Sequence, residues 1–298
     1  MLVRFWGTRG SIPSPGEQTV RYGGNTPCVE VRPDDSSLII LDAGTGIRPL
    51  GERLIASPGS VSACIAITHP HWDHIQGFPF FRPLFAPGNA LTIIGPETPA
   101  TPLRKIFSDV MNKTYFPVKL DELRASITFR PIGEEAVGFG STTIRSCYVN
   151  HPFLTLGYRI EAGGKSLVYV SDNEPFRTNG GDTESGVAPV TIGKYRSHTG
   201  DPDEHLIRFV EGADLLIHDA TFTPDEYEQH IGWGHADYRF ALHVAGRAGV
   251  RELILFHHHF IHSDEEIDRI LDQCRAEAST KGYRFRCNAA AEGGMIEW

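Results

Sequence analysis

The sequence predicts a single domain of mixed α/β (α+β) class, in which sheets lie in the middle and helices cover them. Short apolar runs recur along the whole chain, helical patterns are fewer, and strands come first before strands and helices mix. The 298 residues contain no repeat and no shift in composition. We therefore expect one domain over residues 1–298, with a loop-rich insert near 173–202.

Strands are predicted where runs rich in Val, Ile, Leu and aromatic residues are bounded by Gly, Pro, Asp or Asn. The N-terminal segment also begins with strand and turn signals. In chain order, the remaining runs are 29–31, 38–41, 61–68, 91–94, 142–149, 154–160, 167–170, 215–217, 253–256 and 283–286.

Helices are predicted from capping residues and from apolar residues at helical spacing. The first is expected to begin after Thr101 as its N-cap. A second covers 204–211 and a third 237–248, which ends at a glycine. The last begins after Ser263, which forms a capping box with Glu266.

Composition and charge exclude several classes of protein. An apolar fraction of 40% and a charged fraction of 22% are those of a globular chain rather than a disordered or fibrous one. The net charge of −9 argues against a protein that coats nucleic acid or an anionic membrane through its overall field. Membrane-span and signal-peptide patterns are both missing from the sequence. Because the five cysteines form no CxxC pair, we expect reduced thiols and a cytoplasmic protein.

Several of the 14 histidines gather directly after the apolar run 61–68. His69, His71, Asp73 and His74 place imidazoles and a carboxylate, both common zinc ligands, within one short loop. Alternation along an extended loop aims His69 and His71 one way, while Asp73 and His74 can face a second position. The pattern predicts a metal centre with two positions.

This run resembles the HxHxDH signature of the metallo-β-lactamase superfamily, and further superfamily positions follow in order along nearly the whole chain. The resemblance implies a four-layer αββα sandwich with two divalent ions, zinc or alternatively manganese. It implies that one metal is held by His69, His71 and His151, that the second is held by Asp73, His74 and His257, that Asp172 bridges them, and that Asp42 orients a ligand.

The final ligand has an alternative in His258, which directly follows His257. A ligand set with room for water indicates catalytic rather than structural metal, so the expected chemistry is metal-assisted hydrolysis. Flavodiiron-type members of the superfamily carry a glutamate where this chain has His71, which argues against oxygen or nitric oxide reduction.

A second pair of motifs is similar to those of ribonuclease Z and related small phosphodiesterases. His-Asp-Ala-Thr at 218–221 is followed by Gly-His at 234–235. The resemblance implies that His235 is a general acid and that Asp219 raises its pKa and fixes its orientation. Those relatives have Glu where this chain has Asp219, and Ser or Thr where it has Ala236. The predicted catalytic residues are therefore Asp73, Asp219 and His235.

Contacts to substrate are predicted at three residues. The glycine-rich segments 5–11 and 22–26 fit the first hairpin of the same phosphodiesterase branch, where backbone amides could approach a phosphate with Arg9 or Arg21 nearby, and Asn25 is a further predicted contact. A tight hairpin without any role in binding is the alternative. In the insert, His198 is placed where it could reach substrate, and the insert itself could cover the site.

These observations predict a dinuclear-metal-dependent hydrolase, namely a phosphodiesterase for small or cyclic nucleotide-like phosphodiesters. Extended nucleic acid is not the expected partner, because the insert near 173–202 lacks the basic character of the arm with which ribonuclease Z reaches tRNA. A homodimer is expected from the resemblance alone. The alternatives are a lactonase, thioesterase or lactamase of the same superfamily, an endonuclease for tRNA 3′ ends, and a metal-binding module without turnover.

Overall fold

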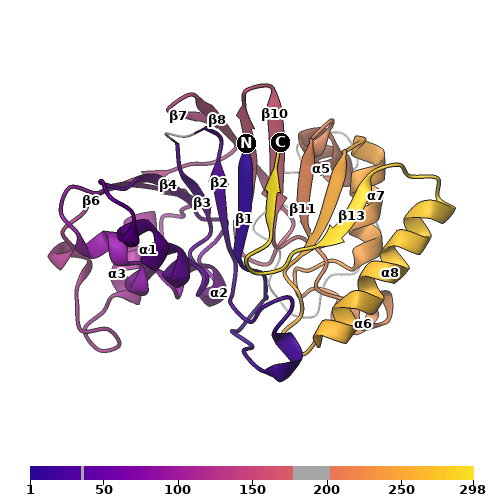
Figure 1. The fold of residues 1–298 in the computed structure, drawn as a ribbon, viewed down its shortest axis with the longest axis horizontal. Helices are drawn as coiled ribbons and strands as arrows, with labels where there is room; N and C mark the ends of the chain where they lie inside the picture. The colour runs from indigo at the N-terminus through magenta and orange to yellow at the C-terminus, as the bar shows by residue number, and fades with distance from the viewer. Residues whose placement is uncertain (35–36, 177–201) are drawn as a thin grey trace.

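The computed structural model describes residues 1–34, 37–176 and 202–298. Within these ranges the strands form two seven-stranded sheets, and helices cover the outer face of each sheet (Figure 1). The succession of helices, sheet, sheet and helices is the predicted αββα sandwich. The predicted fold class is therefore confirmed.

The first sheet has the order β14-β1-β2-β3-β4-β5-β6. Its strands are β1 (Leu2–Gly7), β2 (Cys28–Arg32), β3 (Ile39–Leu41), β4 (Ser62–Ala66), β5 (Ala90–Gly95), β6 (Ser126–Pro131) and β14 (Met295–Glu297). Neighbours are antiparallel from β14 to β3 and parallel from β3 to β6. Helices α1 (Ile47–Ala56) and α3 (Leu103–Val110) cover its outer face, where Leu50 and Phe107 join the core over Ile65.

The second sheet has the order β13-β12-β11-β10-β9-β8-β7. Its strands are β7 (Ala136–Phe139), β8 (Thr142–Val149), β9 (Thr155–Ala162), β10 (Lys165–Val170), β11 (Leu215–Asp219), β12 (Glu252–Phe256) and β13 (Arg286–Ala289). Neighbours are antiparallel from β7 to β10 and parallel from β10 to β13, so the plan of the first sheet is repeated. Its outer face packs against α5 (Pro202–Val210), α7 (Tyr238–Ala248) and α8 (Asp264–Thr280).

Between the sheets lies a third core, built from the inner faces of both. Val29 and Leu41 from the first sheet share this core with Ile217 and Phe256 from the second sheet. Because each sheet is covered on both faces, its central strands are apolar on both faces, which explains their continuous apolar runs. Burial of each such side chain contributes roughly 1.5–3 kcal/mol to folding.

Some local predictions need correction. The run 283–286 is not a strand, since β13 begins at Arg286, and Tyr283 instead packs beside the core under α7. Thr101 is not the N-cap of α3, because Pro102 takes that place. The hydroxyl of Thr101 pairs with Thr98 at 2.7 Å instead. Elements that the sequence did not predict include α1, whose Pro and Gly weaken its helical signal, and the short helices α2 (Trp72–Ile75) and α6 (Pro224–Gln229).

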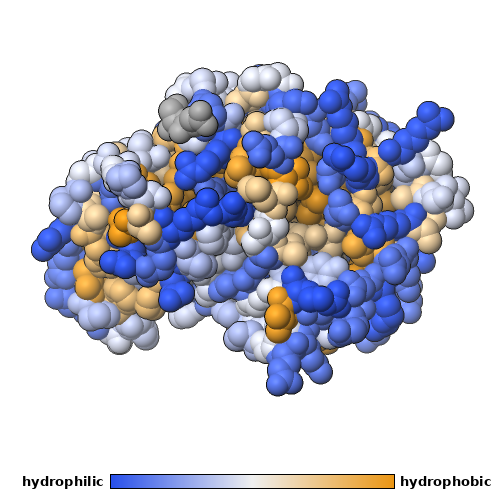
Figure 2. Space-filling model, viewed as in Figure 1, coloured by the Kyte–Doolittle hydropathy of each residue, from blue (hydrophilic) through white to orange (hydrophobic). Residues whose placement is uncertain are grey.

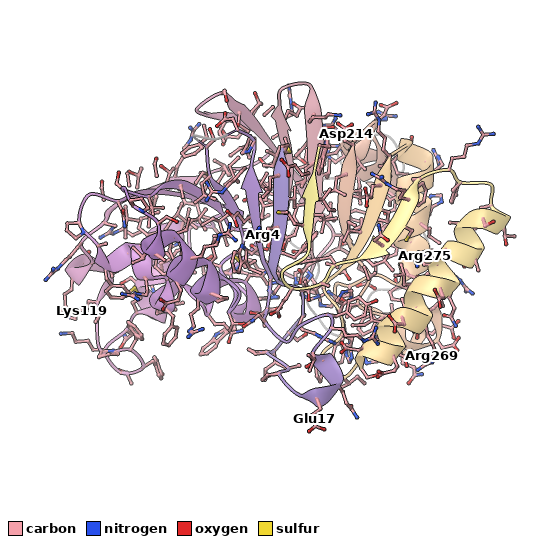
Figure 3. The ribbon with its side chains drawn as sticks, in the orientation of Figure 1. Arg4, Glu17, Lys119, Asp214, Arg269 and Arg275 are labelled. Atoms are coloured by element: carbon pink, nitrogen blue, oxygen red, sulfur yellow. The ribbon has the colours of Figure 1, made fainter. Side chains whose placement is uncertain are left out.

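Hydrophilic residues cover much of the face shown in Figure 2. Charged side chains such as Glu17, Lys119 and Arg269 project from the periphery (Figure 3). Hydrophobic residues on the face shown in Figure 2 form separate patches among hydrophilic ones. Among the described helices, none combines the length and the apolar character needed to cross a membrane.

Candidate metal centre and catalytic site

The candidate ligands lie where strands of both sheets end, at one edge of the sandwich. The chain leaves β4 into a loop and α2, and these two segments carry the whole first-sheet set. In the second sheet, β8, β10 and β12 run in the same direction and end next to a candidate ligand each. From the first sheet come His69, His71, Asp73 and His74, and from the second come His151, Asp172 and His257.

The structure brings all of these residues into one cluster. Ligand atoms lie within 4.8 Å of one another in four overlapping groups. Every member is buried except His71, which is exposed, and His235, which is half-buried. Asp172 belongs to two of the groups and so lies between the two predicted metal positions. The groups are His69–His71–His151, His69–His74–Asp172, Asp73–His74–His257 and Asp172–His235–His257.

In several cluster histidines, the ring nitrogen that faces away from the centre contacts an oxygen outside the cluster. In three rings Nδ1 faces an oxygen that can accept its proton, which leaves the lone pair of Nε2 directed at the centre. The pairs are His74 with the Asp42 carboxylate (2.9 Å), His151 with the Gly234 carbonyl (2.9 Å) and His257 with the Thr221 hydroxyl (3.0 Å). This outer contact is typical of histidines that ligate metal.

Several atoms at the centre of the cluster are buried without a hydrogen-bond partner. They include Nε2 of His69, Nε2 of His74 and Oδ1 of Asp172. Unpaired buried lone pairs are costly, at about 1–3 kcal/mol each. Divalent ions would satisfy all of them together, and imidazole with carboxylate suits zinc or manganese. The residues present therefore fit a centre of divalent ions.

The electrostatics of the cluster agree with this fit. Burial holds the pKa of His69 well below its usual range and lowers the pKa of His151 to about 3, so both rings are neutral. Burial alone would raise the pKa of Asp73 and of Asp172, but neighbouring imidazoles hold both pKa values well below the usual range. Burial would lower the pKa of His74 as well, but carboxylates led by Asp172 and Asp73 outweigh burial and hold that pKa well above the usual range, so metal binding to that ring would displace a proton. Neutral imidazoles and ionised carboxylates are the forms that bind metal.

Asp42 lies directly after β3 and contacts the cluster at the outer nitrogen of His74. Its carboxylate accepts from the backbone N–H of Thr68 (2.8 Å), from the Tyr169 hydroxyl (2.9 Å) and from Nδ1 of His74. Its φ of 61° is in the left-handed region, which Asp tolerates better than most residues. This arrangement can orient the ring of His74.

His235 lies beside the cluster with a carboxylate on its outer nitrogen. Its Nδ1 is 2.9 Å from Oδ2 of Asp219, the last residue of β11. Burial lowers the pKa of His235, but Asp219, Asp172 and Asp73 outweigh burial and raise it to about 9. The imidazole therefore carries a proton at neutral pH, next to the candidate metal centre. Such a group can donate a proton to a leaving group.

The final histidine run resolves into two roles. His257 Nε2 lies 3.2 Å from Asp73 Oδ2, with its backbone in the left-handed region at φ 59°. His258 points the other way, with Nε2 2.8 Å from the carbonyl of Ala290, and burial lowers its pKa to about 3. Of the two alternatives, the structure brings His257 to the cluster.

The N-terminal glycine-rich loop approaches the cluster through residues that were not predicted. The Ser11 backbone N–H donates to Oδ2 of Asp73 at 2.8 Å. A Cβ on Gly10 would lie 2.3 Å from the ring of His257, so only glycine fits there. The glycines of this loop could be recognised in the sequence, but the close approach of Gly10 to His257 could not.

The expectation that Arg9 contacts substrate is corrected, whereas for Asn25 it stays a prediction. Arg9 is fully buried and donates to the carbonyls of Gly23 (2.8 Å) and His262 (2.6 Å), so its guanidinium holds the loop together. The Asn25 side-chain amide donates to Glu292 at 2.9 Å. Both side chains are engaged in the scaffold. His198 and most of the insert near 173–202 lie outside the described residues.

Comparison with known proteins gives the family. The pattern of the Beta-lactamase superfamily domain matches residues 38–192. Ribonuclease Z of Thermoplasma acidophilum is 30% identical over 288 residues, which cover 86% of this chain and 85% of that protein. Human tRNase Z, short form, has the same fold with a TM-score of 0.64 at 18% identity, covering 100% of this chain and 99% of that one. Yeast PDE1 has a TM-score of 0.64 at 16% identity, with coverage of 100% and 99%. The chain thus belongs to the metallo-β-lactamase superfamily, and it is a hydrolase of that fold.

Proposed function

We propose that this hydrolase is a dinuclear-metal-dependent phosphodiesterase that acts on small or cyclic nucleotide-like phosphodiesters. The observation that carries the proposal is the pairing of His235 with Asp219 at 2.9 Å, directly beside the His/Asp cluster. Cleavage of a phosphodiester needs both charge neutralisation at phosphorus and a proton for the leaving oxygen. The two groups of residues supply these two needs separately.

In this proposal each of the two ions would have three protein ligands of its own, and Asp172 would be available to both. When bound, divalent ions would supply Lewis-acid activation of water and would neutralise charge on the phosphoryl group. The outer contacts of His74, His151 and His257 fix the rings, so the ligand atoms need little reorganisation. One position is formed by His69, His71 and His151, and the other by Asp73, His74 and His257.

His235 acts as the general acid. Since Nδ1 is bonded to Asp219, the proton that it can transfer is on Nε2. As the P–O bond to the leaving group breaks, that proton goes to the leaving oxygen, which departs as an alcohol rather than an alkoxide. General acids of this kind contribute about 10²–10⁴-fold to the rate. Thioesters need this acid less, because a thiolate leaves without protonation, which favours the phosphodiester over a thioester.

A small substrate is favoured over folded RNA by the charge of the chain. The net charge of −9 opposes a long polyanion, whereas a small phosphodiester can be held by the ions alone. A second candidate is an endonuclease for tRNA 3′ ends. It is favoured by the relative named ribonuclease Z, which is 30% identical over 86% of this chain.

Turnover of defined phosphodiesters tests the proposal. The metal-loaded chain is expected to hydrolyse bis(p-nitrophenyl) phosphate and either 2′,3′- or 3′,5′-cyclic nucleotides, and chelator should stop it. A precursor tRNA transcript and a lactone and thioester panel are run in parallel. Metal-dependent turnover of the transcript alone would select the endonuclease, and turnover of lactone or thioester that survives His235→Ala would overturn phosphodiesterase activity.

Compartment and assembly complete the proposal. All five cysteines are free and buried, which suits the reducing cytoplasm. We also propose a homodimer, which light scattering on the purified chain would test.

A further inference from the structure

A buried carboxylate near the cluster has no part in the chemistry proposed above. Glu174 lies two residues after Asp172 and only 6% of it is exposed. Its Oε1 accepts from the backbone N–H of Gly232 at 2.8 Å, and its Oε2 accepts from that of Gly234 at 2.9 Å. The hydroxyl of Tyr227, on α6, donates to Oε1 at 3.2 Å. One carboxylate therefore binds both sides of the turn that precedes His235.

The backbone around Glu174 is itself fixed to the site. The Glu174 N–H donates to the carbonyl of Asn150 at 2.8 Å, and the Asn150 side-chain amide donates back to the Glu174 carbonyl at 2.9 Å. The N–H of Asn173 donates to Oδ2 of Asp219 at 3.1 Å. The carboxylate is thus anchored between the segment that leads into His151 and the partner of the general acid.

The turn that Glu174 binds has little stiffness of its own. Gly232 and Gly234 both adopt positive φ, at 89° and 87°. Gly234 also contacts the cluster, because its carbonyl accepts from Nδ1 of His151 at 2.9 Å. A Cβ on Gly234 would lie 2.3 Å from that ring, so the turn packs directly against His151. A shift of the turn would therefore move both the general acid and a candidate ligand.

We infer that Glu174 is a positioning residue that holds the 232–235 turn, and with it His235, in place for proton transfer to the leaving group. The inference rests on the proposed function, because it assigns Glu174 a role through the general acid. It also extends that function, since it makes the start of the insert part of the machinery that orients His235. Bonds to charged acceptors are stronger than neutral ones, so the carboxylate is suited to hold two backbone N–H groups.

Glu174→Gln tests the inference, because glutamine keeps the size but turns an acceptor into an N–H₂ donor that faces a backbone N–H. With saturating metal, kcat for a phosphodiester with an alkoxide leaving group is expected to fall by about 10- to 100-fold, since small misplacements of a reacting group cost that much. With bis(p-nitrophenyl) phosphate the fall should stay within about threefold, because a good leaving group depends little on the acid. Equal losses on both substrates would overturn a role through His235.

Glu252→Gln is the matched control. Glu252 is also 6% exposed and holds Arg286 (2.7 Å) and Asn288 (3.0 Å) at the start of β12, away from the cluster at its other end. This variant should lose stability but show no dependence on the leaving group. If Glu174→Gln behaves no differently from Glu252→Gln, the inference is wrong.

Hydrogen exchange provides a readout that needs no activity. In Glu174→Gln, the amides of Gly232 and Gly234 are expected to exchange at least about 10-fold faster than in the unmodified chain, as each loses an ionised acceptor. Unchanged exchange in the 230–235 peptide would contradict the anchoring itself. If exchange rises while the unmodified chain cleaves no phosphodiester, the anchoring holds and the proposed function fails.

Discussion

The two sheets follow the same plan but supply the candidate site in different ways. The first sheet delivers its cluster residues in one short segment, His69 to His74, directly after β4. The second sheet delivers single residues after β8, β10 and β12, and the proposed general acid His235 comes from the loop before α7. The first half of the site is therefore encoded locally, whereas the second half exists only once the second sheet has formed.

The halves also differ in how their rings are held. In the first half, Asp42 and Thr68 form a buried network around His74 within a single sheet edge. In the second half, the rings are held by a loop carbonyl and a threonine, and the loop is itself held by Glu174. We expect the first half to keep its geometry better when the site is perturbed, and four experiments address this difference.

Removal of metal should have the largest effect. Exhaustive chelation is expected to abolish turnover and to lower the melting temperature, since metal at 1,000 times its Kd stabilises by about 4 kcal/mol. Hydrogen exchange should rise more in peptides covering 149–152 and 256–258 than in 68–75, because the Asp42 network remains. Readdition of zinc or manganese should restore turnover and the melting temperature. Equal exchange in the two halves would contradict the comparison.

Loss of one second-half ligand comes next. His257→Ala is expected to reduce bound metal from about two ions per chain to about one and to lower kcat by roughly 100-fold or more. Its neighbour provides the control, because His258→Ala removes a ring that faces Ala290. That variant should lose about 1–3 kcal/mol of stability but keep its metal. Metal analysis of both proteins decides which histidine is the ligand.

Neutralising the partner of the acid should change the pH dependence. His235 can act as an acid only below its pKa, which Asp219 raises and bound divalent ions would lower, so the rate should fall as pH rises through that pKa. In Asp219→Asn that fall is expected at lower pH, by about 1–3 units, since the carboxylate that raises the pKa is gone. Asp214→Asn, at the opposite end of β11 (Figure 3), should leave the profile unchanged. An unshifted pH profile in Asp219→Asn would contradict the role of His235 as the proton donor.

The smallest effect is expected for Asp42→Asn. Asparagine accepts the left-handed backbone of position 42 and keeps the shape, but it loses the charge behind His74 and turns one acceptor oxygen into an N–H₂ donor beside Thr68 or Tyr169. Metal affinity should fall by about 10- to 100-fold, with kcat at saturating metal nearly unchanged. Isothermal titration with zinc measures the affinity. A drop larger than that of His257→Ala would show that the first half is the more fragile one.

The sequence was sufficient for the fold class and for the set of residues that the structure gathers. His69 to His74 could be recognised because four metal-binding side chains follow one apolar strand, and the second-half residues because they recur at strand ends in superfamily order. Supporting contacts were not visible. Glu174 looks like a loop residue until the 232–234 turn is folded onto it.

Arg9 shows the limit of reasoning from residue type. An arginine in a glycine-rich loop is typical of a phosphate site, but here its partners are carbonyls on segments far away in the chain, including His262. The choice between His257 and His258 had the same limit, since adjacent residues face opposite sides and only tertiary contacts decide which side faces the site.

The left-handed backbone at Asp42 and His257 has a consequence for protein engineering. Non-glycine residues in this conformation cost about 1–3 kcal/mol each, and His257 is required by the proposed site rather than by the fold. Screens for thermostability that are run without metal and ignore turnover should therefore enrich glycine or asparagine at position 257, whereas Asp42 is retained by its buried contacts to Thr68 and Tyr169. Such variants would be more stable but would have an impaired metal centre, so directed evolution of this chain has to select for activity and stability together.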